Sequence, residues 1–252
     1  MRNTGNSLAI DIVIPTAYKD IKVLPLCIRG IKECIQDEIK NIYVISADNE
    51  EIKDICKENS CIFINEVDLM GFSPSELTKI REDKRGWLYQ QLIKLHGGVG
   101  TCENYLVIDS DVVLLRPYRF LDEQGIPTFI TIPSTYKQYG EVNFELTGIK
   151  KEVKQSYIAD KMIFNKEIIK EIHDGIEKKN NMPWINAIVD KYDNKALFGF
   201  SEFELYALVY GNRPHREIKL IELPMHFRDG ITYELCKKRF GSYHCVTFHH
   251  YL

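Results

Sequence analysis

The sequence predicts an α/β fold in which helices flank one central, mostly parallel sheet. Three observations support this prediction: short β-branched runs, helical spacing of apolar residues between them, and Gly or Pro at their boundaries. Strands that alternate with helices are typical of βαβ units, because each helix covers one face of the sheet. At 252 residues, the chain can bury a sizeable core. We expect one domain over residues 1–252, with lobes of about 1–115 and 116–252.

Strand and helix alternate from the start of the chain. Short apolar runs predict strands at 11–16, 42–46 and 61–65. Apolar residues at helical spacing predict helices at 24–35 and, more weakly, at 52–56. The periodicity lapses over 66–84, which predicts a surface excursion. It returns in "GWLYQQLIKL" (86–95), a predicted helix that the glycines from Gly97 to Gly100 end.

The rest of the chain is more helical. Further strands are predicted at 105–108, 129–133, 218–223 and 244–252. The predicted helices are 165–179, 183–192 and 201–210. Residues 134–150 lack a regular pattern and are predicted to be irregular. Asn165 fits the N-cap of the first of these helices, and Pro183 opens the second.

The composition excludes several classes of protein. A content of 44% hydrophobic and 27% charged residues is that of a globular protein, and the net charge of −3 provides no basic field for nucleic acid. The seven cysteines include no CxxC pair, which favours reduced core thiols. The apolar stretch at the start is too short for a signal peptide or a membrane span. We expect a cytoplasmic protein, with any membrane contact peripheral and at the inner face.

The motif "YLVIDSDVVLLRP" (105–117) brings two acids to the end of a buried strand. Ligands of parallel α/β sheets bind beyond the carboxyl ends of the strands, where Asp109 and Asp111 would emerge. Two carboxylates at this spacing suit Mg²⁺ or Mn²⁺ that is also bound by substrate phosphates. The alternative is that both aspartates cap a turn, since aspartate is favoured where strands stop.

In this context the sequence resembles the GT-A class of nucleotide-sugar glycosyltransferases. The aspartate strand looks like their metal-binding DxD strand, and "DIVIPT" looks like the first strand of their nucleotide-binding half. The resemblance is strongest to bacterial glycosyltransferases of surface-polysaccharide loci, which pair a "GWLYQQLIKL"-like helix with "DSD" and a late "SEFELY"-like helix. It covers residues from about 10 to 250.

The resemblance implies a GT-A type, Rossmann-like fold that binds a nucleotide-diphosphate sugar, with a UDP-sugar as the expected donor. Asp109 and Ser110 would lie near the nucleotide and the metal, and Asp111 would be the direct metal ligand. The residues implied along the base pocket are Thr16, Ala17 and Tyr18. The implied acceptor is a bacterial surface glycan or its lipid-linked precursor. Lys84 and Arg85 could meet the diphosphate, although a solvated charged loop explains them equally well.

Two glutamates of "SEFELYALVY" are candidates for the general base of an inverting transfer. Glu204 and Ser201 fit a capping box, which explains Glu204 without catalysis. Glu202 lies in the first helical turn, where the helix dipole stabilises a carboxylate whatever its role. The resemblance implies an acid at this position that deprotonates the acceptor hydroxyl. We favour Glu202 as the base, because Glu204 has the competing capping role.

Histidines near the end of the sequence are candidates for completing the metal shell. In "TFHHYL", only one of His249 and His250 could reach the metal directly, because neighbouring strand residues face opposite ways. His226 is a further candidate for a metal or diphosphate contact. Asp160 and Lys161 could approach the acceptor, whereas Met162 to Phe164 fit ordinary core.

Two other functions remain open at this point. A haloacid-dehalogenase-like phosphohydrolase also carries DxD after an apolar strand, but normally on the first strand and before a Gly-Thr turn. Here the motif lies near the middle of the chain and continues into Val112-Val113-Leu114. The other alternative is a non-catalytic module that binds a nucleotide sugar or carbohydrate, in which the acids only cap a turn.

Overall fold

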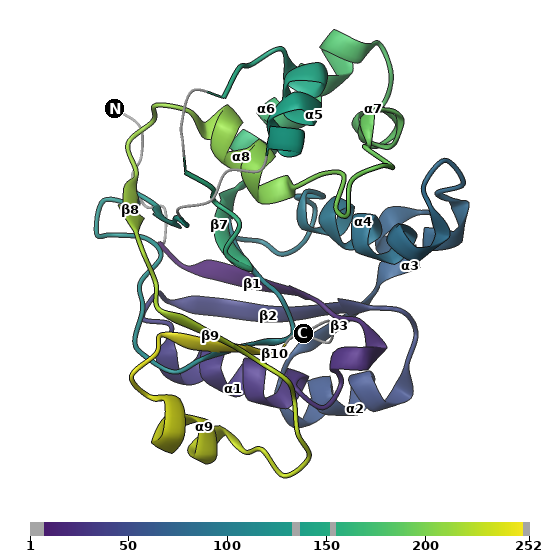
Figure 1. Ribbon diagram of the computed structural model, residues 1–252. Helices are drawn as coiled ribbons and strands as arrows, with labels where there is room; N and C mark the ends of the chain where they lie inside the picture. Colours follow the sequence, from purple (N-terminus) through teal and green to yellow (C-terminus); the bar gives the residue numbers. More distant parts are fainter. Residues whose placement is uncertain (1–7, 133–136, 152–154, 249–252) are drawn as a thin grey trace.

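A computed structural model describes residues 8–132, 137–151 and 155–248 (Figure 1). Within these residues, the main sheet has the strand order β3-β2-β1-β4-β7. Its strands are β1 (Ile10–Pro15), β2 (Ile39–Ser46), β3 (Ile62–Asn65), β4 (Asn104–Ile108) and β7 (Lys161–Asn165). Strands β1 to β4 run parallel, and β7 pairs antiparallel with β4 at one edge. The predicted, mostly parallel α/β sheet is confirmed.

Helices cover both faces of this sheet. Figure 1 shows α1 and α2 on one side, with α4 and the α6–α8 group on the other. The helices are α1 (Leu24–Cys34), α2 (Glu50–Glu58), α3 (Glu66–Met70), α4 (Glu82–Lys94), α5 (Lys137–Thr147), α6 (Lys166–Asn180), α7 (Trp184–Lys191), α8 (Glu202–Tyr210) and α9 (Tyr233–Phe240). Because both faces are covered, the central strands are apolar runs without alternation, as in β1, where every residue is buried.

The acid within β1 has a structural role. Asp11 is fully buried, and its Oδ2 accepts hydrogen bonds from the backbone N–H groups of Thr101 (2.6 Å) and Cys102 (2.8 Å). Asn41 donates to the other carboxylate oxygen at 3.1 Å. Asp11 thus fixes the loop that enters β4, and so helps to place the acids at the far end of that strand.

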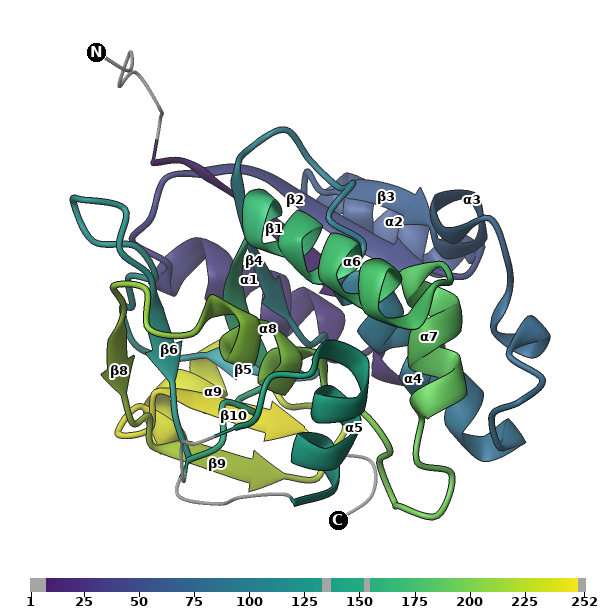
Figure 2. The same cartoon turned by 90° about the horizontal axis from the view of Figure 1, so that it is seen from above.

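A second, smaller sheet continues from the aspartate motif. It has the order β5-β10-β9 and lies to one side of the main sheet when seen from above (Figure 2). Its strands are β5 (Val112–Leu114), β9 (Glu222–Met225) and β10 (Cys245–Phe248). A further parallel pair joins β6 (Thr128–Ile130) to β8 (Arg216–Ile218).

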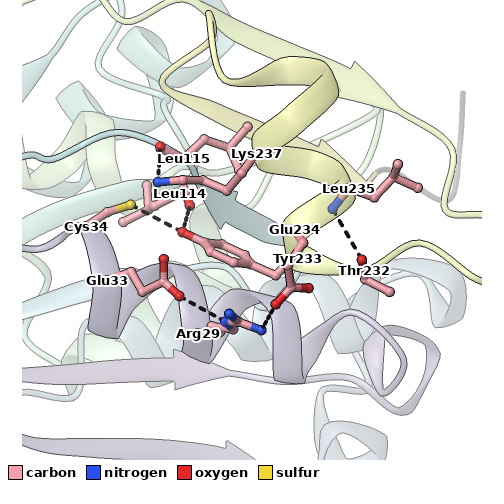
Figure 3. Close-up of polar contacts among 10 residues, drawn as sticks. All are labelled: Arg29, Glu33, Cys34, Leu114, Leu115, Thr232, Tyr233, Glu234, Leu235 and Lys237. Carbon is pink, nitrogen blue, oxygen red and sulfur yellow. Dashed lines mark hydrogen bonds and ion pairs between the residues drawn. The ribbon is translucent and has the colours of Figure 1, made fainter.

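Helix α9 fastens the small sheet to α1 (Figure 3). The Tyr233 hydroxyl donates to the carbonyl of Leu114 at 3.1 Å and lies 3.5 Å from Cys34 Sγ of α1. Lys237 donates to the carbonyl of Leu115 at 2.9 Å. Arg29 of α1 forms ion pairs with Glu33 and Glu234. The strand that follows the DxD motif is therefore held between α1 and α9.

Several elements differ from the sequence prediction. The expected excursion at 66–84 contains α3 and a 3₁₀ turn, Pro74–Glu76, and α4 begins four residues earlier than expected. Residues predicted to be irregular form α5, and the run predicted as one strand at 218–223 is divided between β8 and β9. The sequence prediction contained neither β7 nor α9. Asn165 does cap α6, accepting from the N–H groups of Glu167 and Ile168.

Within the described part of the chain, no helix has the length and apolar character needed to cross a membrane. All seven cysteines are free thiols, as predicted.

Candidate functional site

A pocket of about 180 Å³ lies at the carboxyl ends of β1 and β4. The aspartate motif leaves β4 there, opposite the loop that follows β1 and beside the face of α4. This is the position at which a doubly wound sheet binds ligands. The lining residues are Pro15, Lys19, Asp20, Trp87, Gln90, Gln91, Lys94, Asp109, Ser110, Asp111, Tyr139, Ile158, Asp160, Phe198, Ser201, Glu202 and Phe203.

A buried lysine joins the first aspartate to the glutamate of α8. Lys94 Nζ lies 2.7 Å from Asp109 Oδ1 and 2.8 Å from Glu202 Oε1. The lysine side chain is 3% exposed, and its ammonium also lies over the ring of Phe203. Burial lowers the pKa of Lys94, but the Asp109 and Glu202 carboxylates together raise it above its ordinary value. The lysine therefore stays charged and provides the counter-ion that these carboxylates require.

Further acids make the pocket strongly acidic. Burial raises the pKa of Asp109, while Lys94 opposes that rise, and burial also raises the pKa of Glu202. Burial and the nearby carboxylates of Asp109, Glu222 and Asp111 raise the pKa of Asp160 to about 7. Ser110 lines the same pocket, and its hydroxyl donates to Asp20, a further acid of the lining, at 2.9 Å.

The chemistry of this donor set fits a divalent metal that shares its ligands with a substrate. In the described ranges, no group of three or more His, Cys, Asp and Glu side chains is arranged to hold a metal ion. Two carboxylates are nevertheless sufficient for Mg²⁺ or Mn²⁺ when phosphate oxygens and water complete the shell. Burial and, to a smaller extent, neighbouring carboxylates raise the pKa of Asp109 and of Asp160, so another cation would be favourable here.

The two glutamates of α8 have different surroundings. Glu202 lines the pocket, whereas Glu204 does not. Glu204 Oε1 accepts from the Ser156 hydroxyl at 2.5 Å and from the backbone N–H of Tyr157 at 3.0 Å, and its Oε2 is paired with Lys151. Ser201 does accept from the N–H of Glu204, at 3.4 Å, so one half of the predicted capping box is present. A complete capping box would require the Glu204 side chain to accept from the backbone N–H of Ser201. Instead, this side chain binds Ser156 and Tyr157.

The residues expected along the base pocket, Thr16, Ala17 and Tyr18, follow β1 but do not line the described pocket. Thr16 is buried, and its hydroxyl donates to the carbonyl of Ile14 at 3.1 Å. Ala17 caps the 3₁₀ turn Tyr18–Asp20, and the Tyr18 side chain is 59% exposed. The neighbouring Pro15 and Lys19 line the pocket itself.

Lys84 and Arg85 lie in the first turn of α4, away from the pocket lining. The Lys84 ammonium lies 4.9 Å from the centre of the Phe198 ring. Arg85 Nε donates to the carbonyl of Ile80 at 3.1 Å, which ties it to the preceding loop.

The histidine predictions concern the end of the small sheet. His226 is exposed and follows β9. His249 and His250 lie outside the described residues. The last described residue, Phe248, donates its N–H to the carbonyl of Asp111 at 2.9 Å, so β10 ends beside the motif.

Sequence reasoning missed the polar face of α4. Trp87, Gln90, Gln91 and Lys94 all line the pocket, and their spacing of i, i+3, i+4 and i+7 places them on one side of a helix. Both glutamines line the pocket, and Gln91 is 4% exposed. The sequence does contain a signal for this face, because the stripe of polar residues along α4 lies beside a separate stripe of apolar residues.

Comparisons with known proteins agree on the fold. An active-site mutant of LgtC has 12% identity and a TM-score of 0.50, covering 95% of this chain and 87% of its own. The galactosyltransferase LgtC in complex with donor and acceptor sugar analogues has 13% identity, a TM-score of 0.49 and the same coverage. Mouse xyloside xylosyltransferase 1, in its apo form, has 10% identity and a TM-score of 0.49, covering 95% of this chain and 97% of its own.

The match to the LgtC mutant shows that the chain has the GT-A glycosyltransferase fold. No curated protein sequence matches the chain. A family model described as "Family of unknown function (DUF6492)" matches residues 7–228.

Proposed function

Because the chain belongs to DUF6492, a family whose function is unknown, we propose its activity from its pocket: it transfers a sugar from a nucleotide-diphosphate donor to a glycan acceptor. One observation carries the proposal. The DxD acids, a buried lysine and an acid from α8 converge at the strand ends of a GT-A fold, and Lys94 touches both Asp109 and Glu202. A module whose aspartates only cap a turn has no need for this buried ion triad.

The donor would lie with its diphosphate against Asp109 and Asp111. These side chains would hold Mn²⁺ or Mg²⁺, with His226, His249 and His250 as the predicted further ligands. When bound, the metal would neutralise charge on the departing nucleoside diphosphate. Lys94 keeps Asp109 ionised and in place, and so preserves the acceptor oxygens that such a cation needs. The preferred donor is a UDP-sugar.

Glu202 is the proposed base for the acceptor hydroxyl, in an inverting transfer. Its carboxylate lines the pocket, and burial raises its pKa toward the range useful for proton transfer, against the opposing effect of Lys94. After transfer, the proton would remain on Glu202 until solvent enters. The proposed acceptor is a bacterial surface glycan or its lipid-linked precursor, and the protein would act in the cytoplasm, at the inner face of the membrane.

The phosphohydrolase alternative receives no support from the site. That class normally carries its DxD motif after the first strand, whereas here the motif follows β4 of the main sheet.

Calorimetry with UDP, in the presence and absence of Mn²⁺, tests the proposal. We expect UDP to bind only with the metal, and Asp111→Asn to weaken that binding at least about tenfold through loss of a charged contact. The matched control is Asp174→Asn, an exposed acid of α6, which should bind like the wild type. Metal-independent binding, or an equal loss in both variants, would refute the metal site. A panel of nucleotide sugars then identifies the donor by its hydrolysis.

A further inference from the structure

One residue of the pocket has an unusual backbone. Within the described residues, the non-glycine residues with positive φ are Ser60 (53°), Asp160 (53°) and Asn181 (54°). Ser60 follows the end of α2, and Asn181 is the C-cap of α6, so both lie where left-handed residues commonly end helices. Asp160 ends no helix. It lies immediately before β7 and lines the pocket.

The surrounding structure holds Asp160 in this conformation. Its carbonyl accepts from the backbone N–H of Asp109 at 2.9 Å. On one side, Glu204 holds Ser156 and Tyr157. On the other side, the buried Lys161 donates to the carbonyl of Ala159 at 3.1 Å and to Glu222 at 2.5 Å. A strained residue persists when its neighbours fix it in this way, and such residues cluster at functional sites.

The Asp160 side chain is available for a ligand. It is partly exposed and lines the pocket, and within the described residues it forms no hydrogen bond or ion pair with another side chain. In contrast, Lys94 pairs with Asp109 and Glu202, and Ser110 donates to Asp20. When ionised, this carboxylate only accepts hydrogen bonds, so it can bind a ligand group that donates one.

We propose that Asp160 is a substrate-contacting residue whose carboxylate accepts hydrogen bonds from hydroxyl groups of a sugar in the pocket. This inference rests on the proposed function. A sugar hydroxyl suits the site because it is a hydrogen-bond donor, and Asp160 lines the same pocket as Asp109 and Asp111. The strained backbone directs this carboxylate toward the pocket, which explains why a residue other than glycine occupies a left-handed position there.

The variants Asp160→Gly and Asp160→Asn test the inference, with Ser60→Gly as the matched control. Glycine adopts positive φ freely, so both glycine variants should melt at or above the wild-type temperature. Asparagine tolerates the same backbone and keeps a polar side chain without the charge. Mn²⁺–UDP affinity should stay within about twofold in all three variants, because the diphosphate contacts are retained.

The rates of donor hydrolysis and of transfer to the acceptor then distinguish whether Asp160 contacts the donor sugar or the acceptor sugar. Hydrolysis of the donor that the wild type cleaves fastest should fall at least about tenfold in Asp160→Gly if Asp160 holds the donor sugar. Hydrolysis should be unchanged, and transfer to the acceptor should fall by a similar factor, if it holds the acceptor sugar. Ser60→Gly should alter neither rate. The inference is overturned if both rates stay at wild-type values in Asp160→Gly, or if UDP affinity falls as much as the rates. Failure of the wild type to bind Mn²⁺–UDP would instead refute the proposed function.

Discussion

Two glutamates two positions apart in α8 show how position decides the role of a side chain. Glu202 faces the pocket and Lys94, whereas Glu204 faces a polar segment of the chain and accepts hydrogen bonds from it. Both are almost fully buried. Their sequence context is nearly the same, so a pattern of acids at a helix start predicts that one of them is functional without identifying which.

The change of each glutamate to glutamine should therefore separate activity from stability. Glu202→Gln should lower turnover by roughly 10²–10⁴-fold, because the base is lost, while Mn²⁺–UDP binding stays near the wild-type value. Glu204→Gln should lower the free energy of unfolding by about 1–3 kcal/mol, because a buried acceptor of several donors is replaced. Steady-state hydrolysis and urea unfolding measure the two effects. Similar turnover in both variants would contradict the assignment of Glu202.

Lys94 is the residue on which the charge balance of the pocket depends. Lys94→Met should lower the free energy of unfolding by about 3–5 kcal/mol, since Asp109 and Glu202 would be left as buried acids without a counter-ion. The double variant Lys94→Met/Glu202→Gln should lose less than Lys94→Met alone, with a coupling of about 0.5–3 kcal/mol. Urea unfolding of the full cycle measures this coupling. Purely additive losses would show that the ion triad is not an energetic unit.

At the scale of elements, α1 packs unusually close to the strand that follows the DxD motif. A Cβ atom on Gly30 would lie 2.8 Å from the backbone N and O of Leu114 in β5. Backbone atoms cannot move aside like a flexible side chain, so this contact requires glycine. The contact explains why α1 can place β5, and with it Asp111, so near the main sheet.

A pair of glycine-to-alanine changes tests this packing. Gly30→Ala should lower the free energy of unfolding by about 1–3 kcal/mol, because the added methyl overpacks the helix–strand contact. Gly175→Ala, in the exposed middle of α6 with open space at its Cβ, should raise it by about 0.5–1 kcal/mol. Thermal and urea unfolding provide the measurement. Stabilisation by both changes would mean that α1 can shift away from β5.

The sequence predicted the helices and strands that have a strong local pattern of apolar residues. It did not predict elements that depend on contacts with residues far away in the sequence. β1, β2, β4 and α6 have strong apolar runs or periodicity, and each was located within a few residues. β7 was read only as core, because its partner β4 is far away in the sequence and nothing local reports an antiparallel edge. α9 is only eight residues long, and its Tyr233 contacts α1 and β5, which a local pattern does not report.

The candidate site could likewise be predicted only in part from the sequence. Asp109, Asp111 and Glu202 could be selected because their residue types follow a strand or begin a helix. Lys94 could not, since a lysine within an amphipathic helix is usually solvated and only the tertiary fold shows its burial between two carboxylates. Asp160 was weighed only as an acceptor contact, because a left-handed backbone cannot be read from an aspartate alone.

At the scale of the whole molecule, the GT-A fold places an acidic pocket at the carboxyl ends of β1 and β4. The pocket is fit for an anionic ligand only when a cation accompanies it, because its acids outnumber the neighbouring basic groups. Metal and nucleotide should therefore bind with positive coupling.

Thermal unfolding measures this coupling. Mn²⁺ with UDP, each far above its dissociation constant, should raise the melting temperature by several degrees, because a ligand at about 100 times its Kd adds about 2.7 kcal/mol. Either component alone should have a smaller effect than the pair, and EDTA should reverse the rise. Asp111→Asn should remove the joint effect, whereas Asp174→Asn should retain it. An equal rise with UDP alone would contradict the coupling.

The backbone contacts of Asp111 with Phe248, and of Leu115 with His244, have a kinetic consequence. Residues separated by half the chain must meet before these bonds form, and contacts of high sequence separation close slowly. During refolding from denaturant, the local βαβ units should regain their helical signal first. The ability to bind a ligand should return in a later and slower phase.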